Sequence, residues 1–327
     1  MRELINAFPE QLDAAWKNAH STTIKGTSNP IHNVVISGLG GSGIGGKIMS
    51  QLIQGSARVP VFVNNDYALP AFVSATTLVI ISSYSGNTEE TVSAMKQALD
   101  KGAMIACISS GGEVTDLATS NELDIIRIPG GNPPRSQFGY SSISLARMLE
   151  AYGIAPKGFF ARFEHMGTFL RSNKEDILKE AESMTSQLNG KRIILYSELN
   201  NEGVAIRWRQ QLNENSKLLC WHHVYPEMNH NELVGWESGN ADYVAVMLRT
   251  SDDNPRSAKR MDITKEIYAS KGAEIIEVNA QGSTKEERAF QLINLGDWLS
   301  LRLAEVNDVD PVIITSIDYL KNELSKF

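Results

Sequence analysis

Short apolar runs alternate with segments of helical spacing along most of the chain. In the first half, such runs begin at His32, Val59, Thr77, Met104 and Asp124. The stretches between them, such as GKIMSQLI and TVSAMKQALDKG, have the spacing of amphipathic helices. A strand, a helix and a strand repeated every ~20 to 30 residues are typical of parallel βαβ units. Because the runs are apolar on both faces, they predict a sheet covered by helices on each side.

The second half of the chain repeats this plan. Its predicted strands begin at Lys191, Lys217, Tyr243 and Ala273. Its predicted helices cover GVAIRWRQQLNE, DNPRSAKRMDITKEIYASKG and STKEERAFQLINLGDWLSLRLAEV. In the first of these helices, Val204, Trp208 and Leu212 share one face. The sequence therefore predicts two similar α/β domains, residues 1–155 and 156–327, in a chain of 327 residues.

Composition and charge narrow the class of protein. No apolar run approaches the ~18 residues that span a bilayer, and the first residues, MRELINAFPEQLDAAW, lack the apolar core of a signal peptide. The net charge is −7 and no long basic run appears, which argues against nucleic acid as a partner. Cys107 and Cys220 lie in apolar runs and are expected to be buried thiols. These features favour a cytoplasmic protein that binds neither nucleic acid nor membrane.

The first strand leads into a glycine-rich segment, SGLGGSGIGGKIM. Gly38, Gly40 and Gly43 match G-x-G-x-x-G between a strand and a helix, which is the context of the dinucleotide fingerprint. Asp66 ends the second strand, near where a ribose-binding carboxylate would stand. Taken alone, this segment favours a nicotinamide-dependent dehydrogenase.

A second segment, ISSYSGNTEET at residues 81–91, follows the third strand and precedes a helix. Hydroxyls and backbone N–H groups gather there at a helix start, where the helix dipole favours an anion. An ordinary helix cap would explain Ser85 or Asn87. A cap uses one side chain, however, and this segment carries four hydroxyls before its helix. Two anion-binding segments on neighbouring strands favour a small phosphorylated ligand over a dinucleotide, which needs one pyrophosphate loop.

GGSGIGG followed by SSYSGNTEET resembles the sugar isomerase (SIS) domain, a doubly wound, flavodoxin-like αβα domain that binds phosphosugars. The resemblance implies that Ser83, Ser85 and Thr88 hold the substrate phosphate, with Gly41 and Ser42 beside it. Two such domains, together with NPPRSQFGYS, LNENSK, PEMNHNELVGWE and IDYLKNEL, resemble the bifunctional phosphoglucose/phosphomannose isomerases over nearly the whole chain.

Aldose–ketose isomerisation of a 6-phosphosugar requires ring opening, a base that moves a proton between C1 and C2, and a cation near the enediolate. The resemblance implies that Glu214 is the base and that His230 and Lys321 open the ring. It assigns the cation to Arg135, which follows two prolines that stiffen the chain. In related isomerases the histidine comes from the neighbouring subunit, so the resemblance also implies a homodimer with shared active sites.

No cofactor and no metal are expected. His222 and His223 are neighbours on a predicted strand and point to opposite faces, and neither H-E-x-x-H nor a cysteine cluster occurs. The resemblance thus predicts a metal-independent isomerase that interconverts glucose 6-phosphate or mannose 6-phosphate with fructose 6-phosphate. A phosphosugar-binding regulator without catalysis and a dehydrogenase remain as alternatives.

Overall fold

The computed structural model describes residues 1–238 and 241–326. The chain divides into two compact units, each built on its own sheet. The N-terminal unit consists of Asn6–Asn173 and Gly282–Phe290. The C-terminal unit consists of Met1–Ile5, Lys174–Gln281 and Gln291–Phe327. Each unit includes at least one segment that lies outside its main stretch of the sequence. A single boundary at residue 155 therefore stays a prediction.

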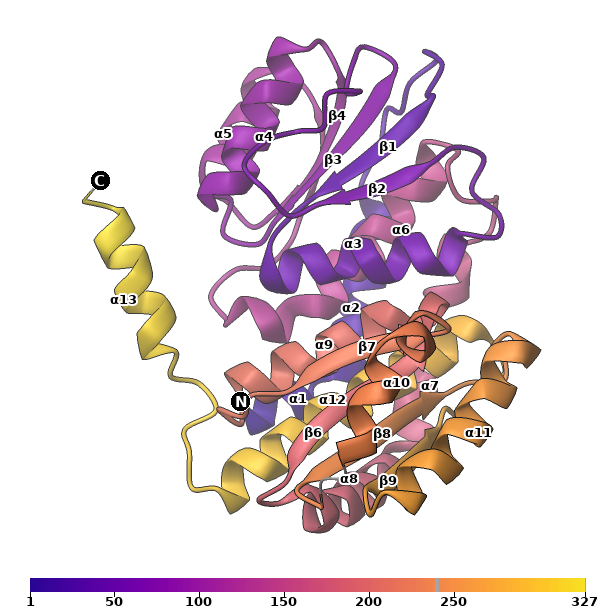
Figure 1. Cartoon of the computed structure of the whole chain (residues 1–327). Coiled ribbons are helices and arrows are strands. Elements are labelled where there is room, and N and C mark those ends of the chain that lie inside the picture. Colours follow the sequence, from indigo (N-terminus) through magenta and orange to yellow (C-terminus); the bar gives the residue numbers. More distant parts are fainter. Residues whose placement is uncertain (239–240, 327) are drawn as a thin grey trace. The chain divides into compact units, whose positions relative to one another are not determined.

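The sheet of the N-terminal unit is parallel, with the strand order β2-β1-β3-β4-β5 (Figure 1). Its strands are β1 (Asn33–Ser37), β2 (Val61–Asn64), β3 (Thr77–Ser83), β4 (Met104–Ser109) and β5 (Asp124–Arg127). Its helices are α2 (Phe8–Ser21), α3 (Gly40–Ile53), α4 (Glu89–Asp100), α5 (Gly112–Ser120), η1 (Pro134–Gln137), α6 (Phe138–Ala151), η2 (Phe160–Phe163) and α7 (Met166–Ser172). The step from β1 to β2 runs opposite to the steps from β3 to β5, so right-handed crossovers place α3 on one face and α4 and α5 on the other.

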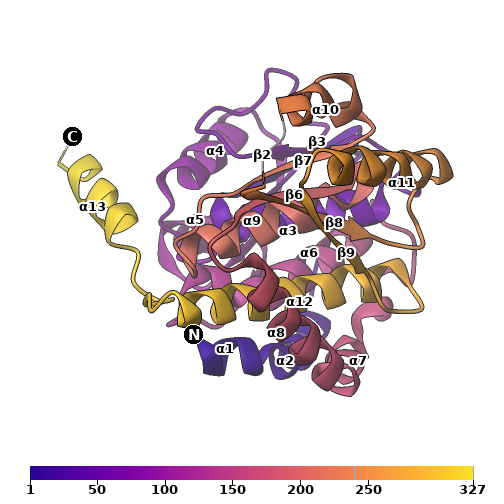
Figure 2. The ribbon, with the colours of Figure 1, turned by 60° about the horizontal axis from the view of Figure 1, so that its bottom comes forward.

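The sheet of the C-terminal unit is also parallel, with the order β7-β6-β8-β9 (Figure 2). Its strands are β6 (Arg192–Glu198), β7 (Trp221–Tyr225), β8 (Tyr243–Arg249) and β9 (Glu274–Asn279). The helical elements are α1 (Arg2–Asn6), α8 (Lys174–Leu188), η3 (Leu199–Asn201), α9 (Glu202–Glu214), η4 (Glu227–His230), α10 (Glu232–Gly235), η5 (Trp236–Ser238), α11 (Pro255–Ser270), α12 (Lys285–Val306) and α13 (Thr315–Leu324). The same handedness rule places α9 on one face and α10 and α11 on the other.

The hydrophobic pattern predicted these elements well. Every predicted strand is present, and both sheets are parallel and covered on both faces. Val204, Trp208 and Leu212 are buried on one side of α9, as their spacing predicts. Several strands are shorter than the predicted runs. The clearest case is β7, which begins at Trp221, four residues after Lys217, because the positive φ of 57° at Lys217 is incompatible with an extended strand.

The two cysteines are free and buried, in agreement with the prediction of buried thiols. Within residues 1–238 and 241–326, none of the helices combines the length and the apolar character needed to cross a membrane.

Candidate active site

The carboxyl ends of β1 and β3 form the first part of the candidate site. These two strands are adjacent, and Ser37 at the end of β1 is in register with Ile81 of β3. The strand order reverses between them, and in open α/β sheets ligands bind outside the carboxyl ends at such a point. The glycine-rich segment after β1 and the serine-rich segment after β3 therefore leave the sheet side by side.

The glycine-rich segment forms the turn after β1 and the first turns of α3. Helix α3 begins at Gly40, so only Gly38 of the fingerprint precedes it. A Cβ atom on Gly43 would lie 2.3 Å from the carbonyl oxygen of Gly38, and one on Gly41 would lie 3.2 Å from the Cα atom of Arg135. The glycines thus allow the start of α3 to approach neighbouring backbone closely.

The serine-rich segment is held by hydrogen bonds among its own hydroxyls. The Ser83 hydroxyl donates to Thr88 Oγ1 at 3.2 Å and accepts from the N–H group of Gly86. Ser85 Oγ accepts from the N–H group of Asn87 at 3.2 Å. Ser83 is buried, Thr88 is half-buried, and Ser85 is exposed. The segment directly before α4 therefore carries one buried, one half-buried and one exposed hydroxyl.

Capping of α4 does not account for these side chains. Thr88 is the N-cap residue of α4, and it makes no side-chain cap hydrogen bond there. Asn87 Oδ1 instead accepts from the N–H group of Glu113, in the first turn of α5, at 2.9 Å. The cap alternative for Ser85 or Asn87 on α4 is wrong, because both side chains point to other partners.

The two segments after β1 and β3 also contact each other and the segment around Arg135. Ser42 Oγ accepts from the N–H group of Tyr84 at 3.0 Å, and the Tyr84 hydroxyl accepts from the N–H group of Asn132 at 3.0 Å. Arg135 itself is 3% exposed in η1, directly after the two prolines. The structure therefore brings Gly41, Ser42, the serine-rich segment and the Arg135 segment together within the N-terminal unit.

The remaining predicted site residues lie in the C-terminal unit. Glu214 is the last residue of α9 and is half-buried. His230 ends η4 and is exposed. Lys321 lies in α13, which has no buried residue, and Figures 1 and 2 show this helix standing away from the sheet of its own unit. The roles of these three side chains stay predictions.

The segment that carries His230 is attached to the sheet by a partly buried hydrogen-bond network. The Tyr196 hydroxyl on β6 donates to Glu232 Oε1 at 2.5 Å and accepts from Trp236 Nε1 at 3.0 Å. His223 Nδ1 on β7 lies 2.9 Å from the other Glu232 oxygen. Burial raises the pKa of Tyr196 far above its usual range, and the hydrogen bond to Glu232 raises it further. Tyr196 thus remains a donor to the Glu232 carboxylate.

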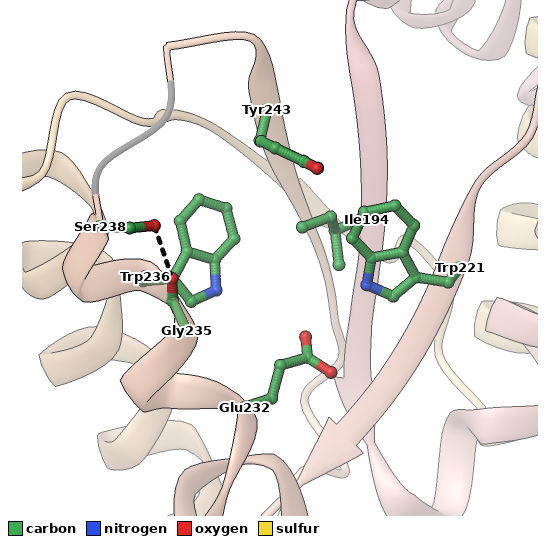
Figure 3. Close-up of a pocket in the computed structure, with 7 residues that line it drawn as sticks. All are labelled: Ile194, Trp221, Glu232, Gly235, Trp236, Ser238 and Tyr243. Carbon is green, nitrogen blue, oxygen red and sulfur yellow. Dashed lines mark hydrogen bonds between the residues drawn. The ribbon is translucent and has the colours of Figure 1, made fainter.

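A pocket of about 230 Å³ lies beside this network (Figure 3). It is lined by Ile194, Trp221, Glu232, Gly235, Trp236, Ser238 and Tyr243. Figure 3 shows the rings of Trp221, Trp236 and Tyr243 around the space, with the Glu232 carboxylate at its edge. None of these residues was predicted as a site residue, because they come from β6, β7, β8 and the α10–η5 segment, which local spacing does not connect.

The histidines point apart, as predicted. His222 contacts Arg209 and Glu202 of α9, whereas His223 contacts Glu232 of α10, on the other face of the sheet. Among the residues that the structure describes, no group of three or more His, Cys, Asp and Glu side chains is arranged to hold a metal ion.

Comparisons with known proteins identify the two domains and their relatives. Residues 29–145 match the SIS domain, and residues 177–324 match the bacterial phospho-glucose isomerase C-terminal SIS domain. A bifunctional phosphoglucose/phosphomannose isomerase from Caldicellulosiruptor bescii is 37% identical, over 100% of this chain and 99% of the relative. Another from Aquifex aeolicus is 34% identical, over 91% and 92%. The solved tagatose-6-phosphate ketose/aldose isomerase from Escherichia coli shares the fold, with a TM-score of 0.72, 14% identity and 95% coverage of both chains.

Proposed function

Because this chain belongs to the family of bifunctional phosphoglucose/phosphomannose isomerases, we propose that it interconverts glucose 6-phosphate and mannose 6-phosphate with fructose 6-phosphate. The observation that carries the proposal is the hydroxyl-rich segment after β3, in hydrogen-bond contact with the start of α3 where the strand order reverses. The dehydrogenase alternative is disfavoured because the chain belongs to a family of isomerases.

In this proposal the substrate phosphate is held by Ser83, Ser85 and Thr88, with Gly41 and Ser42 beside it. The start of α4 directly behind Thr88 supports this role, since the helix dipole and the first backbone N–H groups favour an anion there. Hydroxyl donors and a helix start suit the phosphate dianion, and phosphate binding supplies energy that can position the reacting carbons.

Proton transfer is assigned to Glu214. In the open-chain aldose, the carboxylate removes the proton from C2 and leaves an enediolate, and the same group returns that proton to C1 while a proton moves from O2 to O1. Glucose and mannose 6-phosphates differ only at C2 and give the same enediol after rotation about C2–C3. The half-buried position at the end of α9 supports this role, because a base must be partly shielded yet reachable.

Three cationic or titratable side chains complete the proposed chemistry. Arg135 stabilises the negative enediolate, and its burial directly after two prolines supports a fixed guanidinium. His230 and Lys321 exchange the protons of ring opening. A histidine suits that step because it can accept and donate a proton near pH 7.

The proposal includes a homodimer in which His230 acts in the partner's active site. The exposure of His230 and of the whole of α13, including Ile317, Leu320 and Leu324, supports surfaces that a second copy covers. Mixing Glu214→Gln and His230→Ala chains under exchange conditions tests it. If the two residues come from different chains, about one quarter of wild-type activity returns, since half of the dimers are mixed and each has one intact site. No recovery despite subunit exchange contradicts the shared site.

The activity itself is tested with the purified protein on both aldose phosphates, by coupled detection of fructose 6-phosphate, with and without EDTA. We expect turnover of both substrates in either condition. Binding of fructose 6-phosphate without turnover would favour the phosphosugar-binding regulator. The proposal also keeps the protein in the cytoplasm, which the two free cysteines support.

A further inference from the structure

Helices α9 and α12 are joined by a buried row of polar side chains. Arg207 and Gln211 of α9 and its C-cap residue Asn215 lie at i, i+4 and i+8 and so share one face. Arg207 Nη2 donates to both Asp297 oxygens, at 3.0 and 2.8 Å, and Gln211 Nε2 donates to Asp297 Oδ1 at 2.8 Å. Asn215 Nδ2 donates to Ser300 Oγ at 2.9 Å. We call this row the α9–α12 seam.

The seam continues one residue further, past the end of α9. The Ser216 hydroxyl donates to the backbone oxygen of Ser300 at 2.6 Å, and the Ser300 hydroxyl donates to the backbone oxygen of Asp297 at 2.8 Å. Asn215, Ser216 and Ser300 are each at most 1% exposed. The two residues that directly follow Glu214 are therefore both anchored to α12.

Stability alone gives no reason for such a seam. A buried ion pair such as Arg207 with Asp297 pays a large desolvation cost, and apolar side chains of similar volume are often equally stabilising. Hydrogen bonds differ from apolar contacts in being directional, so a row of them fixes both the rotation and the axial position of a helix. The ends of helices fray most readily, and two hydrogen bonds of the seam, from Asn215 and Ser216, lie directly past the end of α9.

We propose that Asn215 and Ser300 are positioning residues for Glu214. They hold the last turn of α9 against α12 and so fix the backbone from which the Glu214 carboxylate extends. This inference rests on the proposed function, in which Glu214 is the base. Neither residue contacts substrate in this account, and both act through the place of the carboxylate.

The test is Ser300→Ala, which removes the hydroxyl that Asn215 reaches and leaves the backbone oxygen that Ser216 reaches. A misplacement of a catalytic group by 1 Å can cost about 100-fold in rate, so we expect kcat to fall about 10- to 100-fold, with KM for fructose 6-phosphate nearly unchanged. We also expect a larger kinetic isotope effect with aldose deuterated at C2, because proton transfer becomes the slowest step.

Thr185→Val is the matched control. Thr185 on α8 is 3% exposed in the same unit, and its hydroxyl donates to the backbone oxygen of Ala181 at 2.7 Å. This variant loses one buried hydroxyl but touches no part of the seam, so kcat and the isotope effect stay at wild-type values. Asn215→Ala is the second seam variant, for use if Ser300→Ala does not fold.

The outcomes separate the inference from the proposed function. Full kcat in the seam variants, with an inactive Glu214→Gln enzyme, overturns the inference and leaves the base assignment intact. An equal loss of kcat in Thr185→Val, or a loss without a change in the isotope effect, also overturns it, since either indicates general destabilisation. An active Glu214→Gln enzyme removes the base assignment and the inference with it.

Discussion

The two sheets of this protein can be compared strand by strand. Strands β6 and β8 occupy the positions in the C-terminal sheet that β1 and β3 occupy in the N-terminal sheet, because each pair lies where the strand order reverses. The chain after β3 carries serine and threonine hydroxyls, whereas the chain after β8 reads TSDDNP. The same topological position therefore carries different chemistry in the two units.

The C-terminal position is built around carboxylates. Asp253 accepts from the N–H group of Thr250 at 3.1 Å and from its hydroxyl at 3.0 Å. Glu198, 5% exposed at the end of β6, accepts from the N–H group of Asn200 at 2.8 Å. Burial raises the pKa of Asp253, and the Glu198 charge contributes to this shift. Two carboxylates in this place repel a phosphate dianion, whereas the hydroxyls after β3 in the N-terminal unit suit one.

This difference teaches that a shared fold does not imply a shared site. In the proposed function the C-terminal unit contributes through other elements, namely the end of α9 with Glu214 and η4 with His230. Under this proposal, variants in the two units should fail in different ways. Variants in the C-terminal unit should lose catalysis, and variants in the N-terminal unit should lose phosphate binding.

The largest effect is expected for Glu214→Gln, in the C-terminal unit. General-base catalysis contributes about 10²- to 10⁴-fold, so kcat should fall by that factor while fructose 6-phosphate still raises the melting temperature. Glu202→Gln, at the other end of α9, is the control and should retain most of its activity. If Glu214→Gln also lost the binding of fructose 6-phosphate, the assignment of catalysis to one unit and of phosphate binding to the other would be contradicted.

The next effect is expected for Ser85→Ala, in the N-terminal unit. A hydrogen bond to a charged group is worth about 1.5–3 kcal/mol, which corresponds to about a 10- to 100-fold rise in KM. Ser251→Ala is the matched control, because Ser251 is also exposed and also lies two residues beyond its central strand. Steady-state kinetics on both variants decides the point. An equal rise in KM for Ser251→Ala breaks the comparison.

A smaller effect is expected on stability, where Tyr152 in the N-terminal unit and Tyr196 in the C-terminal unit each donate a hydrogen bond to a carboxylate. Tyr196→Phe removes the donor to Glu232 and the acceptor of Trp236 Nε1, so we expect a loss of about 1–3 kcal/mol in the free energy of unfolding. Tyr152→Phe should cost less, about 0.5–1.5 kcal/mol. Its partner Asp124 also accepts from the N–H groups of Lys25 and Gly26. Urea unfolding curves measure both, and the reverse order would contradict the network.

The smallest effect is expected for the two cysteine thiols, which are buried in both units. Burial raises the pKa of Cys107 and of Cys220 to about 12. At pH 8 both are thiols in the folded protein, and only the thiolate is nucleophilic. A disulfide reagent should therefore label neither cysteine until urea is added. Because the folded pKa lies above the unfolded value of about 8.5, the associated stability is present below that value and is lost as the pH rises towards 12. Rapid labelling of either cysteine by the disulfide reagent at pH 8, before urea is added, would contradict the burial of the thiols.

The amino-acid sequence by itself determined the elements and the residue types of the site. Short-range periodicity predicts the strands and the buried face of α9, and the local sequence shows the hydroxyls before α4. Each of these features can be recognised in a single stretch of chain. Once the strand order is known, right-handed crossovers fix the face of the sheet that each helix covers. The family motifs supplied the roles, which periodicity does not contain.

Only the tertiary structure decided which distant segments meet. The start of α3 approaches the Arg135 segment, the seam joins Asn215 to Ser300, and Tyr196 reaches Glu232 and Trp236. These partners are separated by some 36 to 94 residues in the chain. Their contacts depend on how helices pack across a sheet. The spacing of residues within one element does not indicate which residues of another element it will contact.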